Sequence, residues 1–388
     1  METVVLRRTS RILAGHLWVF SNELDGSPKR LAPGGLVELK DMKGAFLGIG
    51  YANPHSLIAV RILTRKKEEI DRAFFVQRIR AALELRKRFV KETDAFRAVF
   101  SESDSLPGLI VDKYGDTLSI QFSTLGMETQ SGHVIAALEE VFLPTTIVLR
   151  NDTSIRTLEG LNMEKRVIKG SLETLPVIKE RGTLFEVDPM AGQKTGFFLD
   201  QAENREAFKG LASKGKALDL FCYTGAWSVK LAEAGSDVIG VDSSEAAVKQ
   251  AERNAVLNNL SERCAFVRSD VFEFVKAEVS KGAARYDAIV LDPPAFVKSK
   301  ANMKEGLKAY RELNASCLKL LKDGGIFATS SCSFHVDRLT FLDMLRSAAR
   351  DAGRSGRILE VRSQAKDHPI ALTVPETEYL KCVIMAID

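Results

Sequence analysis

Five reactive side chains follow short apolar runs in the second half of the chain, at points where β-strands are expected to end. They are Asp219, Asp242, Asp270, Asp292 and Cys332. Ligands of open α/β sheets bind beyond the carboxyl ends of the parallel strands, so these side chains are expected to meet in one crevice. One acid at a strand end is unremarkable, whereas four acids and a cysteine predict a functional site.

The stretch 216–244 predicts one nucleotide-binding half of a doubly wound sheet. It reads as a buried strand (217–221), a tight loop (222–225), a helix (226–234) and a second buried strand (237–241). The loop lacks the G-x-G-x-x-G pattern with which backbone approaches a pyrophosphate. A carboxylate at Asp242 can instead accept both ribose hydroxyls, which favours S-adenosylmethionine over NAD. An incidental acid on a Rossmann-like fold is the alternative interpretation.

The length and the charge distribution of the chain indicate how many domains it has and what kind of partner it binds. A chain of 388 residues, 45% hydrophobic and 27% charged, is typical of a globular protein with two or three domains. Residues 1–100 carry 19 Lys/Arg against 11 Asp/Glu, and the remainder carries 36 against 40. This asymmetry favours an N-terminal region that faces nucleic acid, although a solvated basic face would give the same count.

Targeting and metal signals are lacking in the sequence. METVVLRRTS does not resemble a signal peptide, and no apolar run reaches the length of a membrane span. The five cysteines form neither a C-x-x-C pair nor a zinc-like set with histidine. We therefore expect a cytoplasmic protein without membrane association, metal or disulfides.

The first 182 residues are expected to form two smaller domains. Residues 1–65 read mostly as strands, with a hairpin in LVELKD-MKG-AFLGIGYAN and a helical turn over 11–24. Residues 66–90 predict a basic amphipathic helix, whose polar side includes Arg86 and Arg88 as candidate RNA contacts. An α+β pattern follows.

Two further local structures are expected later in the chain. The mixed-charge segment 156–166 is expected to be a surface loop, and a helix is expected to begin near Phe198.

Several segments, in order and spacing, resemble a known family. They are FEVDPMAGQKTGFFLDQAENR, LDLFCYTGAWS, VIGVDSS, AFVRSDVF, DAIVLDPPAFVKSK and SSCSFHV. They resemble the class I S-adenosylmethionine-dependent RNA methyltransferases with an N-terminal PUA domain that form 5-methylcytosine in large-subunit ribosomal RNA. The resemblance implies an α/β protein: a small PUA β-barrel (1–70), a small central α+β domain (71–182) and a Rossmann-like catalytic domain (183–388).

The resemblance also assigns the cofactor site. It implies that Asp242 binds the ribose, Asp270 the adenine amino group, and the loop from Asp219 to Gly225 the methionine part. The residues expected to bind S-adenosylmethionine are Thr195, Phe198, Asp219, Phe221, Tyr223, Gly225, Asp242, Ser243, Asp270, Val271 and Asp292.

A covalent route explains why a cysteine would face the target base. Cytosine C5 is a poor nucleophile, and addition of a thiolate at C6 makes it enamine-like. Cys332 is the expected nucleophile, and Asp292 is expected to hydrogen-bond the N3/N4 edge. Pro293 and Pro294 would stiffen the loop, and Phe296 would stack on a flipped base. The acceptor of the C5 proton is not evident, with His335 as one candidate.

One departure keeps other functions open. Many RNA cytosine-C5 enzymes carry a second cysteine where this chain has Pro294-Ala295. A nitrogen methyltransferase on the same fold would need no thiolate, and a non-catalytic ribosome-assembly RNA-binding protein would need no chemistry. A small-molecule methyltransferase would not need the basic N-terminal module. Ribosomal RNA is the expected partner, and the sequence leaves a homodimer open.

Overall fold

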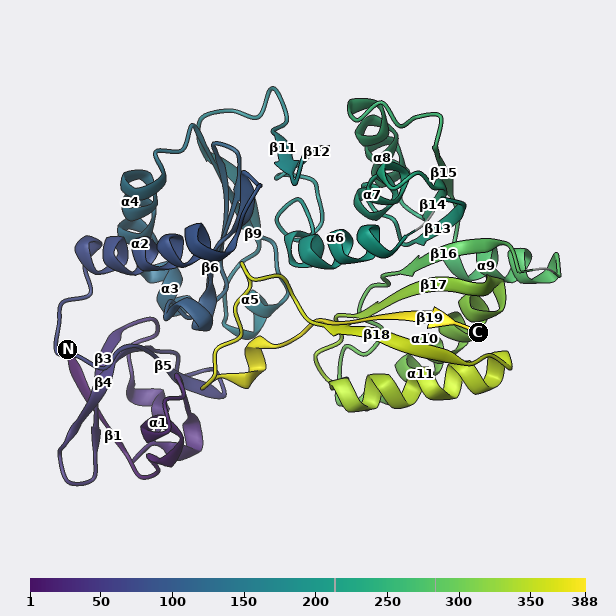
Figure 1. The fold of residues 1–388 in the computed structure, drawn as a ribbon. Helices are drawn as coiled ribbons and strands as arrows, with labels where there is room; N and C mark the ends of the chain where they lie inside the picture. Colours follow the sequence, from purple (N-terminus) through teal and green to yellow (C-terminus); the bar gives the residue numbers. More distant parts are fainter. Residues whose placement is uncertain (213, 283) are drawn as a thin grey trace. The chain divides into compact units, whose positions relative to one another are not determined.

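The computed structural model describes residues 1–212, 214–282 and 284–388. The chain forms two compact units (Figure 1). The first unit comprises residues 1–181, 187–199 and 366–377; the second comprises 182–186, 200–365 and 378–388. In the described chain, no helix combines the length and apolar character required to cross a membrane.

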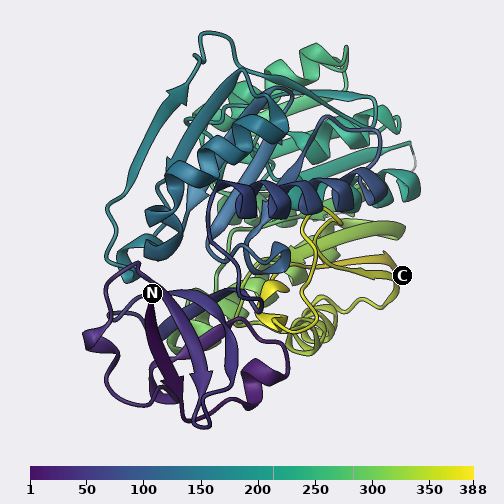
Figure 2. The same cartoon turned by 90° about the vertical axis from the view of Figure 1, so that its left-hand side faces the viewer.

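The first unit begins with a curled five-stranded sheet, visible in the purple part of Figure 2. Its strands run in the order β1-β3-β4-β5-β2. They are β1 (Glu2–Leu6), β2 (Trp18–Phe20), β3 (Leu36–Asp41), β4 (Phe46–Ala52) and β5 (Ile58–Thr64). The predicted hairpin is confirmed as β3 and β4, which pair antiparallel.

The predicted helical turn over 11–24 is wrong for its middle. Ser10–Leu13 is helical (α1) and Ser21–Glu23 forms a 3-10 turn, but Trp18–Phe20 between them pairs with β5. Val19 is fully buried while its two neighbours are half-buried, which is the alternation of a strand. The strand pattern in W-V-F is too short to stand out against the surrounding helix formers.

A second five-stranded sheet follows, in the order β10-β9-β8-β7-β6. The strands are β6 (Ala95–Phe100), β7 (Leu109–Tyr114), β8 (Thr117–Phe122), β9 (Thr146–Asn151) and β10 (Glu164–Lys169). The accompanying helices are α2 (Arg72–Phe89), α3 (Leu125–Thr129), α4 (Ser131–Phe142) and α5 (Ile155–Leu158). The short strand β11 (Val177–Glu180) comes next.

The expected surface loop over 156–166 is only partly a loop. Arg156, in α5, is 1% exposed and donates to the carbonyl oxygens of Phe122 and Asn162. The charge pattern that suggested a solvated segment thus includes a guanidinium with a structural role inside the second sheet domain.

Buried polar contacts join the two sheets of the first unit. Arg61 of β5 pairs with Glu159 at 2.9 Å, and Asn53 donates to the same carboxylate at 2.7 Å. The Tyr51 hydroxyl donates to the carbonyl oxygen of Pro107 at 2.7 Å. A buried charge is costly unless it is paired, so these contacts favour packing of the first sheet against the part of the same unit that contains β6 to β10.

An ionic cluster holds the two later segments of the first unit. Arg97 binds both carboxylate oxygens of Asp112, at 2.8 and 2.7 Å. The hydroxyl of Thr195, from segment 187–199, donates to the same carboxylate. The backbone N–H of Arg97 donates to Asp367, from segment 366–377, at 2.8 Å.

The second unit contains a seven-stranded sheet in the order β15-β14-β13-β16-β17-β19-β18. Its strands are β13 (Lys216–Leu220), β14 (Asp237–Asp242), β15 (Cys264–Arg268), β16 (Tyr286–Leu291), β17 (Leu321–Ser331), β18 (Gly356–Arg362) and β19 (Lys381–Ile387). The first five in chain order are parallel, and β19 runs antiparallel between β17 and β18. Strand β12 (Thr183–Glu186) precedes them.

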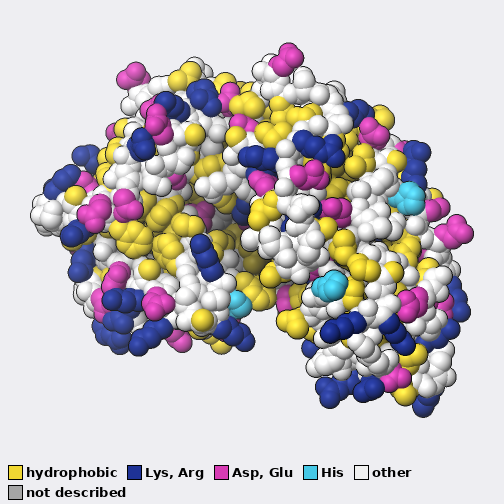
Figure 3. Space-filling view, turned by 180° about the vertical axis from the view of Figure 1, so that it is seen from behind, with side chains coloured by type: hydrophobic (Ala, Val, Ile, Leu, Met, Phe, Trp, Pro, Cys, Tyr) yellow, Lys and Arg dark blue, Asp and Glu magenta, His cyan; other side chains and the backbone are white. Residues whose placement is uncertain are grey.

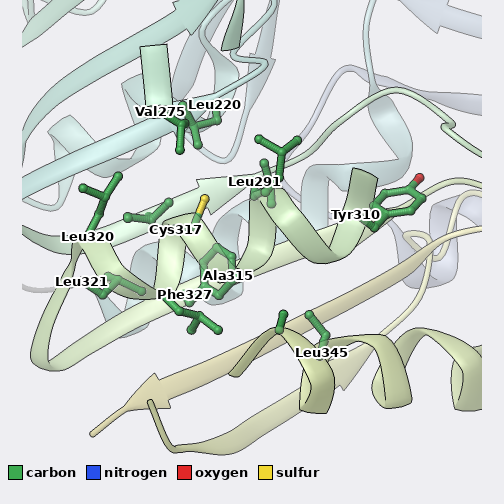
Figure 4. Close-up of a cluster of buried hydrophobic side chains, with 14 of the residues drawn as sticks. Leu220, Val275, Leu291, Tyr310, Ala315, Cys317, Leu320, Leu321, Phe327 and Leu345 are labelled. Atoms are coloured by element: carbon green, nitrogen blue, oxygen red, sulfur yellow. The ribbon is translucent and has the colours of Figure 1, made fainter. Parts of the chain in front are cut away.

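Helices cover this sheet. They are α6 (Ala202–Leu211), α7 (Ala226–Glu233), α8 (Glu245–Leu257), α9 (Val271–Ser280), α10 (Met303–Leu320) and α11 (Arg338–Ala352). Apolar side chains from β13, β16, β17, α9, α10 and α11 form one core, including Leu220, Leu291, Phe327 and Leu345 (Figure 4). The helix expected near Phe198 begins as a single 3-10 turn at Leu199 and continues as α6.

The Arg97–Asp112 pair makes a prediction about stability. Asp112→Asn should lower the free energy of unfolding of the first unit by about 3–5 kcal/mol, because it leaves a buried guanidinium without a counter-charge. The arginine lowers the pKa of Asp112, although burial alone would raise it. The stabilisation is therefore present above the unfolded carboxyl pKa of about 4 and is lost as pH falls through the lower folded value.

A Trp227→Phe background leaves Trp18 as the sole tryptophan, so its fluorescence in urea reports the first unit. The control is Glu164→Gln, which breaks the exposed pair with Arg166 and should cost less than about 1 kcal/mol. Equal stability losses in the two variants would contradict the role given to Asp112.

Candidate active site at the carboxyl edge of the seven-stranded sheet

Strand register brings the predicted strand-end residues to one edge of the sheet. Asp219 lies opposite Gly240 of β14 and Val290 of β16, and Asp242 ends β14 beside Arg268 of β15. Asp292 directly follows β16, and Cys332 directly follows β17. Since these strands are parallel, all of these residues lie at their carboxyl ends.

The loop between β13 and α7 has an unusual backbone. Phe221 and Tyr223 have φ of 63° and 48°, and Gly225 has φ of 77°. Left-handed backbone at non-glycine residues is uncommon and is often found at functional sites. At Gly225 a side chain would also be obstructed, because a Cβ there would lie 2.9 Å from the Cβ of Ala251. The end of the loop, where α7 begins, therefore packs closely against α8.

Asp242 is held by this loop and by its own strand end. The Tyr223 N–H donates to its Oδ2 at 3.0 Å, and the Ser244 N–H donates to its Oδ1 at 2.9 Å. Each carboxylate oxygen can accept a further hydrogen bond, and the residue is half-buried. Ser243 is exposed beside it. The two backbone donors therefore orient a carboxylate that can accept from a diol.

Asp219 is the most perturbed acid of the site. It is fully buried, and its Oδ2 accepts from the hydroxyl of Ser228 at 2.6 Å. Its Oδ1 is also buried and has no hydrogen-bond donor among the residues that the structure describes. Burial, reinforced by the negative charges of Asp292 and Asp242, raises its pKa to about 7. A cationic group placed at Oδ1 would satisfy that oxygen and favour the ionised form.

Asp270 and Val271 lie at the start of α9. Asp270 is exposed and caps the helix, with its Oδ1 accepting from the Glu273 N–H at 3.1 Å. Val271 is 2% exposed and belongs to the apolar core. Capping uses only part of the acceptor capacity of Asp270.

Asp292 is oriented by two residues that the sequence interpretation missed. Gln201 donates from Nε2 toward both carboxylate oxygens, each at 3.0 Å, and Trp227 donates from Nε1 to Oδ2 at 3.3 Å. Asn204 in turn donates to the Oε1 of Gln201 at 2.6 Å. Gln201 belongs to the GFFLDQ segment that carried the resemblance, but its spacing does not reveal a partner 91 residues away.

The loop after Asp292 is tied to the segment after β17. The Tyr310 hydroxyl donates to the carbonyl of Pro294 at 3.5 Å, and its oxygen lies 3.0 Å from the Oγ of Ser333. The Val297 N–H donates to the same Oγ at 3.1 Å. The Sγ of Cys332, which is half-buried, lies 4.0 Å from the carbonyl oxygen of Pro293. The thiol and the Asp292 loop are thus neighbours.

The aromatic expected to stack on a base is itself packed. The Phe296 ring lies 4.7 Å from Tyr310, 5.9 Å from Phe272 and 6.3 Å from Phe221, centroid to centroid. Phe296 is half-buried, so only part of its ring is accessible. Phe334, two residues beyond Cys332, is 54% exposed.

Burial makes the thiols of the other four cysteines less acidic. Burial raises the pKa of Cys264 and Cys382 to about 12, and it raises those of Cys222 and Cys317 as well. None of the five cysteines forms a disulfide in the described structure. Thiolate is the reactive form, so these four are poor nucleophiles.

The predicted site residues of the first unit have other roles. Arg86 is 1% exposed and pairs with Asp104 at 2.5 and 2.7 Å, so the prediction that it contacts RNA is wrong. Its place on the polar side of the helix did not reveal these distant acceptors. Arg88 is exposed, as an RNA contact would require.

Thr195 and Phe198 lie in the same unit. Thr195 is fully buried, and its hydroxyl is engaged by Tyr114 and Asp112, so this side chain is not accessible to a ligand in the structure. Phe198 is half-buried, with the Nζ of Lys194 at 4.5 Å from its ring centroid.

Comparison with known proteins gives a consistent family. Residues 4–65 match the PUA-like domain family, and residues 211–370 match a methyltransferase domain family. Ribosomal RNA large subunit methyltransferase I of Aeromonas salmonicida is 37% identical over 98% of both chains. The protein of that name from Escherichia coli is 34% identical over 96% of both chains.

Solved structures agree on the fold. The crystal structure of SMU.776, a methyltransferase complexed with SAH, has a TM-score of 0.86 at 22% identity and covers 100% of both chains. A SAM-dependent methyltransferase from Streptococcus mutans has a TM-score of 0.84, also at 22% identity over both full chains. The predicted fold class is confirmed, and the predicted cofactor is the one named for the second structure.

These findings point to one family. They are the match to a PUA-like domain, the match to a methyltransferase domain and the sequence identity with relatives along nearly the whole chain. The chain belongs to the family of ribosomal RNA large subunit methyltransferase I.

Proposed function

We propose that this protein transfers a methyl group from S-adenosylmethionine to C5 of a cytosine in large-subunit ribosomal RNA, with Cys332 as nucleophile. The observation that carries the proposal is the position of Cys332. Cys332 directly follows β17, and its half-buried thiol lies beside Pro293, the residue after the oriented carboxylate of Asp292. The family membership supports the class of substrate.

The acids at the sheet edge fit S-adenosylmethionine. Asp242 offers an oriented carboxylate to the ribose diol. The buried Oδ1 of Asp219 offers an acceptor to the α-amino group of the methionine part. Phe221, Tyr223 and Gly225 shape the loop between them, and Asp270 stays our proposed adenine contact. When bound, this cofactor supplies an electrophilic methyl group.

The chain's own residues carry the remaining steps. The thiolate of Cys332 adds to C6 of the cytosine, and the ring electrons shift toward C5, which takes the methyl group. A base then removes the C5 proton, and the thiolate is expelled as the C5–C6 double bond returns. Asp292, held by Gln201 and Trp227, hydrogen-bonds the N3/N4 edge and favours the polarised ring.

Nitrogen methylation is the competing function. The Asp292-Pro293-Pro294 sequence followed by Phe296 is shared with enzymes that methylate nitrogen, and Pro294-Ala295 replaces the expected second cysteine. A nitrogen acceptor needs no thiolate, so the placement of Cys332 favours carbon chemistry.

Exposed cations on the first sheet are candidates for RNA backbone contacts. Basic side chains lie over this sheet at the lower right of Figure 3. The exposed set comprises Arg7, Arg8, Arg11, Lys29 and Arg30. Arg7 pairs with Asp25, and Arg11 lies over the Phe20 ring. In the described structure Arg8 and Arg30 have no ion pair, which leaves their charge for phosphate.

The pKa of Asp219 predicts how cofactor affinity depends on pH. A cation at Oδ1 favours the ionised carboxylate, so binding releases a proton and affinity should rise as pH increases through about 7. Calorimetry at pH 6, 7 and 8 measures this. Asp219→Asn should bind weakly at each pH, without the slope. Asp242→Ala should lose about 2–4 kcal/mol at every pH and keep most of the slope. A pH-independent wild-type affinity would contradict the assignment.

The nucleophile can be trapped. RNA carrying 5-fluorocytosine at the target should form a covalent complex, because fluorine at C5 cannot leave as a proton and the thioether persists. Cys332→Ala should abolish both the complex and methylation, while Cys317→Ala, which removes a thiol buried on α10, should retain both. Denaturing gels and nucleoside mass spectrometry measure the two outcomes. Full activity without Cys332 would end the covalent mechanism and leave the nitrogen acceptor.

Salt dependence tests the RNA contacts. Arg8→Ala with Arg30→Ala should reduce the slope of log affinity against log salt by about 1.4–1.8, since each lost phosphate contact removes about 0.7–0.9. Cofactor affinity should not change. Arg346→Ala, an exposed cation of α11, is the control and should keep the wild-type slope. If the double variant also keeps it, these arginines are merely solvated.

A further inference from the structure

A buried lysine lies beside the proposed nucleophile. Lys381 begins β19 and is only 4% exposed. Because β19 runs antiparallel to β17, Lys381 lies directly opposite Ser331, one residue before Cys332. Lysine is rarely buried without a paired acid, so its position needs an explanation.

The ammonium position is defined by two backbone oxygens. Nζ donates to the carbonyl of Ser333 at 2.7 Å and to that of Tyr379 at 2.9 Å. Ser333 directly follows Cys332, so the lysine fixes the backbone of the residue next to the thiol. Within the described residues, Lys381 forms no ion pair with a carboxylate.

Three acidic groups near Lys381 raise the pKa of its ammonium group by charge attraction. They are Cys332, Glu378 and Asp337. Glu378 is paired with Arg338 at 2.6 Å, and Asp337 caps α11 by accepting from the Thr340 N–H. Both acids therefore have other partners. Burial lowers the pKa of Lys381 to about 8, and the thiolate of Cys332 is the largest influence that opposes this.

We propose that Lys381 accepts the thiol proton of Cys332 and keeps the sulfur as a thiolate next to its own ammonium group. The inference rests on the proposed function, because it assigns the source of the nucleophile's reactivity. It also places a counter-charge beside the buried lysine, whose neighbouring acids Glu378 and Asp337 are engaged by other partners.

The proton balance of this pair is simple. A neutral lysine amine has two N–H donors, which the carbonyls of Ser333 and Tyr379 accept, and one lone pair. The proton moves from Sγ to this lone pair, and the sulfur electron pair is then free to add to C6. When the thiolate is expelled after methylation, the ammonium is already in place, so the pair returns to its starting state. The positive charge beside the sulfur favours the thiolate electrostatically, so we expect the thiol of Cys332 to ionise below the free-thiol pKa of about 8.5.

A purely structural role is the competing explanation, since the lysine also tethers Ser333. Lys381→Gln separates the two roles: its amide can still donate to a carbonyl, but it carries no charge and accepts no proton. Lys381→Met removes both. Lys322→Met, which removes an exposed lysine near the start of β17, is the matched control.

The test is the rate at which iodoacetamide alkylates Cys332, followed by mass spectrometry across pH 5.5–10 in the full-length protein. The wild type and Lys322→Met should react with a midpoint well below the free-thiol value of about 8.5. Lys381→Gln and Lys381→Met should react at least about tenfold more slowly at pH 7, with midpoints above that value, because one pKa unit is a factor of ten.

Three outcomes overturn the inference. These are a wild-type midpoint at or above that of a free thiol, a wild-type profile in Lys381→Met, and a wild-type profile in Lys381→Gln, which would leave the lysine only a tether. The first does not depend on any variant folding. Alkylation needs neither RNA nor methyl transfer, so its result is separate from the fluorocytosine experiment. A thiol that depends on Lys381 but forms no adduct would refute the proposed function and leave the pair intact.

Discussion

A carboxylate removed from water must find a cation or enough donors, or else lose its charge, and both units are organised around this constraint. In the first unit the protein itself supplies the cation, because Arg97 pairs with the fully buried Asp112. Thr195 donates to the same carboxylate, and the backbone N–H of Arg97 donates to Asp367 of segment 366–377. In the second unit Asp219 is equally buried, but its carboxylate accepts a hydrogen bond from the hydroxyl of Ser228 and has no paired cation in the described structure. Burial raises its pKa to about 7. The first carboxylate stabilises a fold, whereas the second keeps a buried oxygen that a cationic ligand, as we propose, would satisfy.

Asp292 illustrates an intermediate solution. It has neutral amide and indole donors in Gln201 and Trp227, which orient its carboxylate without cancelling the charge. The amide is fixed in turn, since Asn204 donates to Gln201 and accepts from Arg362 at 2.8 Å. A chain of hydrogen bonds thus runs from an arginine of β18 to the carboxylate at the end of β16. This network of hydrogen bonds suits the role that we propose for Asp292, which is to bind one edge of a base.

The cysteines follow the same electrostatic logic. Four of them lie where burial raises their pKa, so they pack as small apolar groups. Cys332 alone among the five combines partial exposure with a buried lysine nearby and a place at the carboxyl edge of the sheet. The surroundings of each cysteine therefore separate the four that pack from the one that we propose as the nucleophile.

The sequence by itself determined the elements of the catalytic sheet and the acids at their ends. Continuous apolar runs identify buried parallel strands wherever they pack, and a residue that follows such a run must lie at the carboxyl edge. The tertiary structure decided which side chains face one another. Arg86 looked like a surface cation, yet it reaches Asp104 and the backbone of Asp367. Gln201 and Lys381 had no signal, because their partners lie 91 and 48 residues away. The local pattern of apolar residues predicts which face of a helix or strand is buried. It does not predict the role of a polar side chain, because that role depends on distant residues that folding places beside it.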